Sequence, residues 1–173
     1  IYETPGVYTI SLTVTDDDGG SDTGIYTYIV IYDPAGGFVT GGGWIMSPIG
    51  AYTPDPSLEG KVSFGFVSKY KKGATTPTGN TEFHFKVADL NFKSTSYDWL
   101  VIAGKKAMYK GVGTINGEGE YGIMISVIDG DLQGGDGLDK FHIKIWDMAT
   151  ETVIYDNQLG SEDYADPITV LRG

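Results

Sequence analysis

Apolar and polar residues alternate with a period of two along much of this chain, which is the pattern of β-strands with one buried face. The first clear case places Tyr8, Ile10, Leu12 and Val14 on one face, with threonine and serine between them. An acidic turn, DDDGGSD, and a second β-rich run from Ile25 to Tyr32 follow. The pattern therefore predicts a β-hairpin.

From Phe38 onward the alternation continues in short segments separated by glycine-rich turns. Segments that are apolar on both sides, WLVIAG and YGIMISVI, are expected to be central strands covered on both faces. The predicted strands are Phe38 to Met46, Lys61 to Tyr70, Thr81 to Phe92, Tyr97 to Ala103, Ala107 to Asn116, Glu120 to Asp129, Lys140 to Trp146, Thr152 to Asp156 and Ile168 to Leu171.

Composition supports an all-β fold, because 26 Gly and 12 Tyr accompany many Thr, Val and Ile, and no long run has apolar residues at helical spacing. About eight or nine short strands predict a β-sandwich or jelly roll after the hairpin. The absence of Cys excludes disulfides and Cys-based metal or redox sites.

The stretch PGVYTISLTVTDDDGG resembles the last third of a PKD domain, an immunoglobulin-like sandwich. The resemblance covers residues 1–32 and implies a corner at Pro5 and Gly6, with the hydroxyl of Tyr8 bonded back to the backbone. The earlier strands of such a domain, with their Trp-Asp-Phe-Gly-Asp-Gly stretch, are missing. Residues 33–37 are expected to be a linker, and residues 38–173 a second β-domain.

The second part also resembles a known kind of domain through GGGWIMSP, LNFKSTSYDWLVIAG, YKGVGTINGEGEYG and KFHIKIWD. It is similar to an uncharacterised all-β domain that follows PKD or other Ig-like repeats in large secreted bacterial and archaeal proteins. That resemblance implies an extracellular or cell-surface location and no particular activity. The start at Ile1, without a leader, suggests a piece of a longer protein.

Charge is distributed unevenly, and the net value of −11 disfavours nucleic acid as a partner. Between Lys61 and Lys110 nine lysines face only three acids, a balance of +6, so the rest of the chain sums to −17. Lys69, Lys71 and Lys72 are therefore candidates for binding an anionic partner or another copy of the chain; the alternative is solvated lysines on an exposed turn. No apolar stretch is long enough to insert into a membrane.

A loop of four carboxylates precedes the strand KFHIKIWD and is the candidate metal site. Asp129, Asp131, Asp136 and Asp139 predict one structural calcium ion, because calcium takes six to eight oxygen ligands in flexible geometry. The spacing of the residues from Asp129 matches only the first half of the calcium loop that lies between two helices in EF-hand proteins. The alternative is a long hairpin loop in which Asp and Gly serve as turn residues.

Nucleophilic catalysis would depend on His84 or His142, which alternate with Phe and Ile and are expected on the second face of their strands. Glu118 and Glu120 would be the candidates for carboxylate chemistry, but nothing in the sequence marks a cleft around them. The chain is therefore predicted to be non-catalytic.

Two functions remain from the sequence. The first is a structural or adhesive module whose hairpin is completed by missing or neighbouring Ig-like strands, by the second domain, or by another copy of the chain. The second is a carbohydrate-binding module that recognises polysaccharide through an aromatic face. Trp146 is the candidate platform, whereas Trp99, in an apolar strand, is expected in the core.

Overall fold

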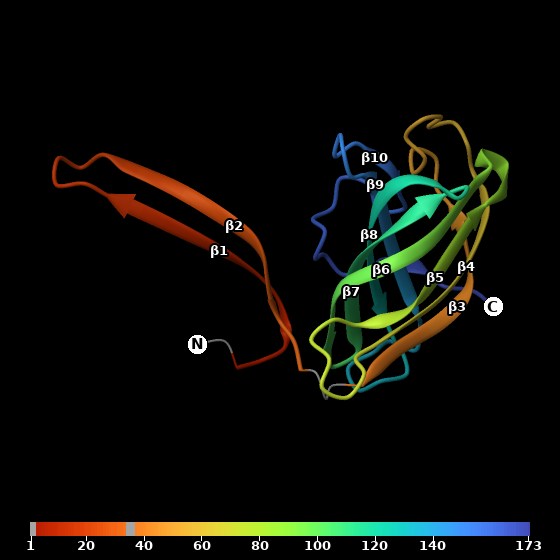
Figure 1. Cartoon of the computed structure of the whole chain (residues 1–173), viewed down its shortest axis with the longest axis horizontal. Helices are drawn as coiled ribbons and strands as arrows, with labels where there is room; N and C mark the ends of the chain where they lie inside the picture. Colours follow the sequence, from red (N-terminus) through yellow and green to blue (C-terminus); the bar gives the residue numbers. More distant parts are fainter. Residues whose placement is uncertain (1–2, 34–36) are drawn as a thin grey trace.

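The computed structural model describes residues 3–33 and 37–173, and strands make up most of it (Figure 1). The all-β class is confirmed: a two-stranded hairpin precedes a nine-stranded antiparallel sheet. The only helical element in the described part is a 3-10 turn, Lys86–Ala88. No helix in these residues is long and apolar enough to cross a membrane.

The hairpin consists of β1 (Gly6–Thr15) and β2 (Ser21–Ile31), antiparallel and separate from the larger sheet. Asp16 holds the turn between them, since its Oδ1 accepts hydrogen bonds from the N–H groups of Asp18 and Gly20 at 3.1 and 2.6 Å. Gly19 has a φ of +85°, which favours glycine. The acidic stretch is therefore a turn, as its composition indicates.

The hydroxyl of Tyr8 donates a hydrogen bond of 2.8 Å to the carbonyl of Thr4. This is the backbone contact that the PKD resemblance predicts for Tyr8. The contact is local, within the entry to β1, so it fixes the corner at Pro5 and Gly6 without defining a family.

The larger sheet is a meander in which each strand from β3 to β10 pairs with the next along the chain. Sequential pairing with short turns follows from alternating segments separated by glycine. Its strands are β3 (Phe38–Ser47), β4 (Gly60–Lys69), β5 (Thr78–Phe85), β6 (Leu90–Ala103), β7 (Lys106–Ile115), β8 (Glu118–Ile128), β9 (Lys140–Asp147), β10 (Val153–Asp156) and β11 (Thr169–Val170).

The sheet curls into a half-barrel, and the chain bridges the two edges of the curl. The last short strand pairs with β9 through Thr169 and Phe141, and just beyond it Arg172 exchanges two backbone hydrogen bonds with Trp44 of β3, at 2.8 and 3.0 Å. Tyr52, after β3, forms a second bridge to β10. The predicted sandwich is thus made from one continuous sheet whose halves face each other.

Aromatic rings fill the concave side of the curl. Phe64 of β4 and Phe141 of β9 stack with ring centroids 3.7 Å apart, although these strands do not pair. Such contacts across the curl hold its two halves together. The side chains there without solvent exposure are Phe141, Ile45, Val62, Phe83, Phe85, Phe92, Tyr109, Ile123, Ile125, Ile143, Ile145 and Tyr155.

A small hydroxyl cluster lies inside the core. The hydroxyl of Thr81 lies 2.8 Å from that of Tyr97 and 2.9 Å from that of Tyr109, and Ser94 lies 3.1 Å from Tyr97. Burial raises the pKa of Tyr109 well above its usual value, because ionisation without water is costly. These hydrogen bonds satisfy polar atoms that would otherwise be buried alone.

The predicted strands are close to the observed ones except around residues 81–97. The expected strand Thr81 to Phe92 is wrong, because the chain turns at Lys86–Ala88 and Asp89 adopts a left-handed φ of 48°. The expected break before Tyr97 is also wrong: β6 runs on through two irregularities in its pairing with β7. Val87, which continues the alternation, is 54% exposed in the turn.

The hairpin touches the larger sheet at its base. Tyr32, just after β2, stacks on Tyr70 at 5.0 Å between ring centroids. The Tyr70 hydroxyl accepts a hydrogen bond from the N–H of Leu100 and donates one to its carbonyl. The predicted linker, residues 33–37, lies mostly outside the described residues.

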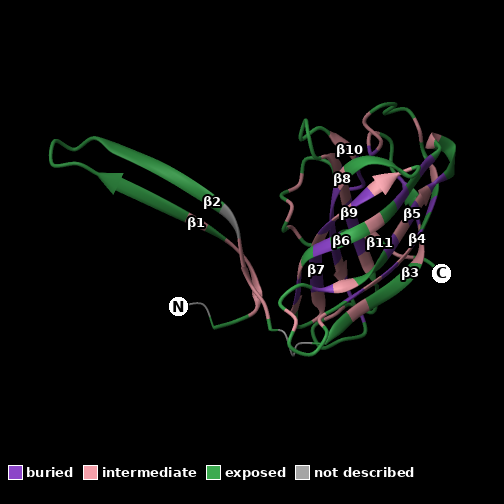
Figure 2. Cartoon of the chain, viewed as in Figure 1, coloured by how far each residue is buried: buried purple, intermediate pink, exposed green. Residues whose placement is uncertain are grey.

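Away from its base the hairpin is bare (Figure 2). Leu12, Val14 and Tyr26 are 65%, 61% and 68% exposed, although Ile10 nearer the base is partly covered. Within one chain, docking of this apolar row on the second domain is therefore not observed for Leu12 and Val14. Burial by another molecule stays a prediction.

Candidate functional site

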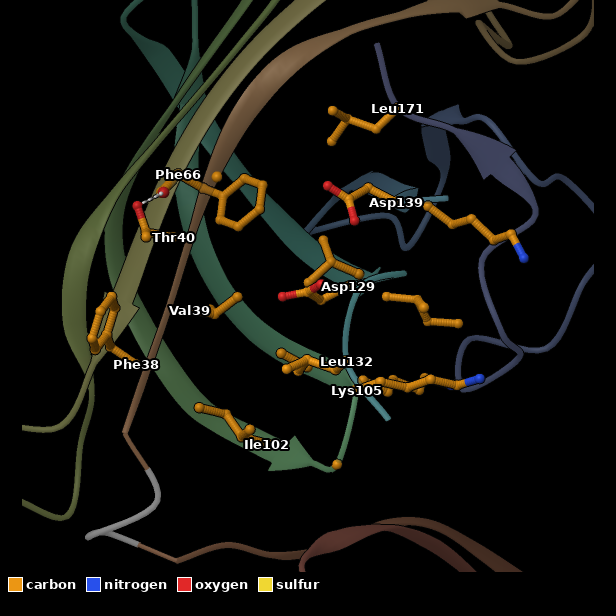
Figure 3. A pocket seen from close by; sticks show the side chains of 17 residues that line it. Phe38, Val39, Thr40, Phe66, Ile102, Lys105, Asp129, Leu132, Asp139 and Leu171 are labelled. Carbon is orange, nitrogen blue, oxygen red and sulfur yellow. Dashed lines mark hydrogen bonds between the residues drawn. The ribbon is translucent and has the colours of Figure 1, made fainter. Parts of the chain in front are cut away.

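A pocket of about 300 Å³ lies at one end of the half-barrel (Figure 3). It occupies the place where the N-terminal part of β3 faces the β6–β7 turn and the start of β9. We call it the mouth pocket. Its lining is Phe38, Val39, Thr40, Gly41, Phe66, Ile102, Gly104, Lys105, Lys106, Ala107, Val127, Ile128, Asp129, Leu132, Asp139, Lys140 and Leu171.

The predicted carboxylate loop forms one wall of the mouth pocket, and it contributes two acids to the lining. The Oδ1 atom of Asp129 accepts a hydrogen bond from the N–H of Asp131 at 3.0 Å, and that of Asp139 accepts one from the N–H of Gly130 at 2.9 Å. Both carboxylates point into the pocket in Figure 3. The local hydrogen bonds are those of turn residues.

The other two acids of the loop do not line the pocket. Asp136 accepts a hydrogen bond from the N–H of Leu138 and pairs with the ammonium of Lys140 at 2.5 Å. The hydrogen bond from Lys140 and that from Leu138 lower the pKa of Asp136. Asp131 is exposed.

The described residues contain no group of three or more His, Cys, Asp or Glu side chains placed to hold a metal ion. The structure therefore brings Asp129 and Asp139 to one pocket without gathering all four carboxylates. Calcium binding by Asp129, Asp131, Asp136 and Asp139 stays a prediction that requires the loop to close around the ion.

The lysines of the pocket rim are engaged outside the pocket. Lys106 donates to the carbonyl of Tyr164 at 2.7 Å and pairs with Asp166 at 2.9 Å. Lys105 donates to the carbonyl of Gly134, and its ammonium points away from the apolar wall in Figure 3. With Lys140 bound to Asp136, all three ammonium groups have partners that are not lining residues.

Trp146 lies on the opposite, convex face of the sheet, next to Gly122 of β8. A Cβ at Gly122 would overlap the indole, so the ring lies directly over the strand. The ammonium of Lys110 lies 5.7 Å from the ring centroid. A second pocket of about 330 Å³, the convex pocket, is lined here by Lys110, Met124, Lys144, Trp146, Glu151 and Asp163.

The other predicted ligand-binding residues are not beside Trp146. Lys69 ends β4 opposite Phe38, at the mouth-pocket end of the sheet, and Lys71 and Lys72 follow in an exposed turn. Trp146 is at the far end of β9 from Lys140, which lines the mouth pocket. The three lysines and Trp146 therefore do not form one site.

Trp99 is not a core residue, and this prediction is wrong. It is partly exposed and pairs with Lys110 on the convex face, because an irregularity between Tyr97 and Trp99 changes the register of β6 with β7. Leu100, the next residue, points into the core instead. The sequence pattern does not indicate this irregularity in β6, because the apolar residues on both sides of it continue to predict a strand.

His142 lies on the second face of β9, as predicted, and it is buried there, with only 2% of it exposed. Its Nε2 is 2.8 Å from Oδ1 of Asp156, itself 4% exposed. Asp156 also accepts a hydrogen bond from the N–H of Gln158. The chain segment after β10 is attached to the same sheet, because Asp163 of this segment forms an ion pair of 2.6 Å with Lys144 of β9.

Ser126 pairs with His142 across β8 and β9, which brings a Ser, a His and an Asp together. Its buried hydroxyl, however, makes no hydrogen bond to any described residue. A nucleophilic triad needs the serine–histidine bond and access for a substrate. With all three side chains buried, the arrangement is that of an internal His142–Asp156 hydrogen bond next to a serine that does not join it.

The other candidates for acid–base chemistry are at the surface. Glu118 and Glu120 lie exposed at the start of β8. His84 is half-exposed, with its Nδ1 2.8 Å from the side-chain oxygen of Asn91.

No protein-family model, curated protein sequence or solved structure matches this chain. Both resemblances drawn from the sequence therefore stay predictions.

Proposed function

We propose that this chain is a non-catalytic structural or adhesive module of a larger secreted or cell-surface protein. Its β1–β2 hairpin would be one part of an intermolecular or interdomain β-structure. The observation that carries this proposal is the bare apolar row of the hairpin, where Leu12 and Val14 are 65% and 61% exposed.

A two-stranded hairpin is marginal in water, and its outer edges offer unpaired backbone groups. Added strands would bury the apolar row of Ile10, Leu12, Val14 and Tyr26, which would stabilise the hairpin. They would also pair with the backbone groups of its outer edges. The occupants consistent with this are neighbouring Ig-like strands of the same polypeptide or those of another copy. In either case the role of the hairpin is association.

The test compares Leu12→Lys with Thr13→Lys, because these neighbours are both exposed but lie on opposite faces of β1. The measurements are the sedimentation of the chain over a range of concentration and the thermal melting of the same variants. We expect Leu12→Lys to weaken association, and Thr13→Lys to leave it unchanged. Equal association of the two variants would remove the proposal.

Carbohydrate binding is the second candidate, favoured by Trp146 lying flat on Gly122 beside the convex pocket. An aromatic ring offers an apolar face to a sugar, and Lys144, Glu151 and Asp163 would supply polar partners. A glycan array tests it with Trp146→Ala, using Trp44→Ala as the control. Trp44 already carries Lys61 over its ring at 4.6 Å and Arg172 at 5.7 Å.

Selective binding that Trp146→Ala abolishes and Trp44→Ala retains would support this second function. Binding lost equally in both variants, or no binding on the array, would count against it.

Structural calcium in the carboxylate loop is a separate prediction, which either function allows. Ligand-linked stabilisation reaches about 2.7 kcal/mol at a hundredfold excess over Kd. Thermal melting in millimolar calcium and then in chelator measures it. A melting temperature that does not change would end the calcium prediction.

A further inference from the structure

We propose that the mouth pocket binds a small amphipathic cation, meaning a compact apolar group that carries one ammonium. The inference is independent of the functions proposed for the hairpin and for Trp146. It comes from the apolar wall of the pocket, the two exposed carboxylates that point into it, and three lining lysines whose ammonium groups are bound outside the lining.

The apolar wall comes from the inside of the half-barrel. Phe66, only 7% exposed, forms the back of the pocket, and a Cβ at Gly41 would meet its ring at 2.7 Å. Glycine at position 41 thus leaves room for Phe66 to lie against β3. Ile102, Val127 and Leu132 complete an apolar lining from β6, β8 and the carboxylate loop.

A volume of about 300 Å³ is at the small end of the range of ligand sites. It is large enough for a compact apolar group such as a six-membered ring, and small for a peptide or a sugar chain. The pocket exists because β3 pairs with β4 on one side only, and the bridge from β3 to the C-terminal segment is further along the strand, at Trp44. Between the start of β3 and that bridge, the two edges of the curled sheet are apart.

The acids and the lysines of the lining differ in their partners. Asp129 and Asp139 each use Oδ1 for a local backbone hydrogen bond, while their Oδ2 atoms have no hydrogen bond to any described residue. The ammonium groups of Lys105, Lys106 and Lys140 bind a carbonyl or an acid outside the lining. The pocket therefore presents negative charge next to an apolar wall, to which an ammonium on an apolar group is complementary.

The experiment is a titration of the full chain with cyclohexylammonium at neutral pH, followed by methyl resonances of isoleucine, leucine and valine. Cyclohexanol serves as the neutral probe of the same shape, and methylammonium as the cation without an apolar body. We expect saturable shifts at Val39, Ile102 and Leu132 with cyclohexylammonium, and binding at least about tenfold weaker with either of the other two probes.

The deciding variants are Asp129→Asn with Asp139→Asn, and the matched control is Asp131→Asn in the same loop but outside the lining. The double variant should weaken cyclohexylammonium binding by about tenfold or more, and the control should leave it unchanged. Calcium binding by all four acids would instead be weakened by Asp131→Asn, which distinguishes the two ideas. Val39→Trp, which would fill the pocket, should abolish binding if the variant retains the wild-type melting temperature.

Three results would overturn the proposal. These are the absence of saturable shifts up to the solubility limit of the probe, equal binding of cyclohexanol, and full binding by a folded double variant.

Discussion

The β1–β2 hairpin and the curled sheet have the same alternation of apolar and polar residues, but only the sheet covers its apolar face. Leu12 and Val14 of the hairpin are 65% and 61% exposed, whereas Ile123 and Ile125 of β8 are fully buried. Alternation determines which side chains share a face. Whether that face is covered depends on how many strands are present to curl over it, and two strands have nothing to curl around.

The largest expected difference between the two regions is in hydrogen exchange. Amides of β9 should exchange only through global unfolding, which for a domain costs about 5–15 kcal/mol, while hairpin amides open locally. In a dilute sample followed by mass spectrometry, we expect β9 to exchange at least about a thousandfold more slowly than β1. Equal protection of residues 8–14 and 140–147 would show that the hairpin is already covered in solution.

Truncation of one large apolar side chain in each region should sharpen the contrast. Phe141→Ala removes a fully buried ring that stacks on Phe64, and we expect it to lower the free energy of unfolding by about 3–5 kcal/mol. Leu12→Ala should change it by less than about 0.5 kcal/mol in the monomer. Urea denaturation monitored by far-ultraviolet circular dichroism, which reports on both regions, measures both changes, and a large cost at Leu12 would contradict the comparison.

Removal of one threonine hydroxyl from each region gives the same contrast, with smaller changes in the free energy of unfolding. Thr81→Val leaves the buried hydroxyls of Tyr97 and Tyr109 short of a partner, at a cost of about 1–3 kcal/mol. Thr13→Val breaks an exposed hydroxyl contact with Thr23, where water substitutes, so a change within about 0.5 kcal/mol is expected. The same denaturation series checks both; similar costs would mean that the core cluster is hydrated.

The smallest effect is expected at an exposed turn of the sheet, where Asp147 accepts hydrogen bonds from the backbone N–H and hydroxyl of Thr150 and from Ala149. The bonds from Thr150 contribute most to a lowered pKa of the Asp147 carboxyl. A lowered folded-state pKa stabilises the fold above the ordinary Asp value and loses that effect as pH falls through the lowered value. Asp147→Asn should therefore melt slightly below the wild type at neutral pH, with the difference vanishing below about pH 3.

Melting curves across this pH range, with Asp131→Asn as the control, measure the effect. A difference that persists unchanged in strong acid would show that the charge of Asp147 is not its origin.

Most strands were predictable from the sequence because alternation is a local property. β8 was expected to be covered on both faces, and Met124 and Ser126 on its second face are indeed buried. The break at Lys86–Ala88 was not predictable in the same way, since Val87 continues the alternation into a turn. There the left-handed conformation at Asp89 overrides the pattern.

The candidate sites were less predictable because they depend on what covers a face. His142 was expected on the second face of β9, where it lies, but its burial there depends on Asp156 of the adjacent strand β10, whose Oδ1 is 2.8 Å from its Nε2. The mouth pocket joins β3, the β6–β7 turn and the carboxylate loop, which only the curl brings together. The loop acids were visible in the sequence, but the separation of Asp129 and Asp139 from Asp131 and Asp136 was not.

The bridge between Trp44 and Arg172 has a consequence for how the chain is made. Ribosomes deliver strands in order, and each from β4 to β10 finds its partner immediately behind it, so the meander grows as it emerges. The bridge to Trp44 can form only after residue 172 has been synthesised. The outer edge of β3, which includes Gly41 to Gly43, is therefore unpaired during most of translation. A nascent chain stalled before β11 would therefore be more prone to mispair with its neighbours than the released protein.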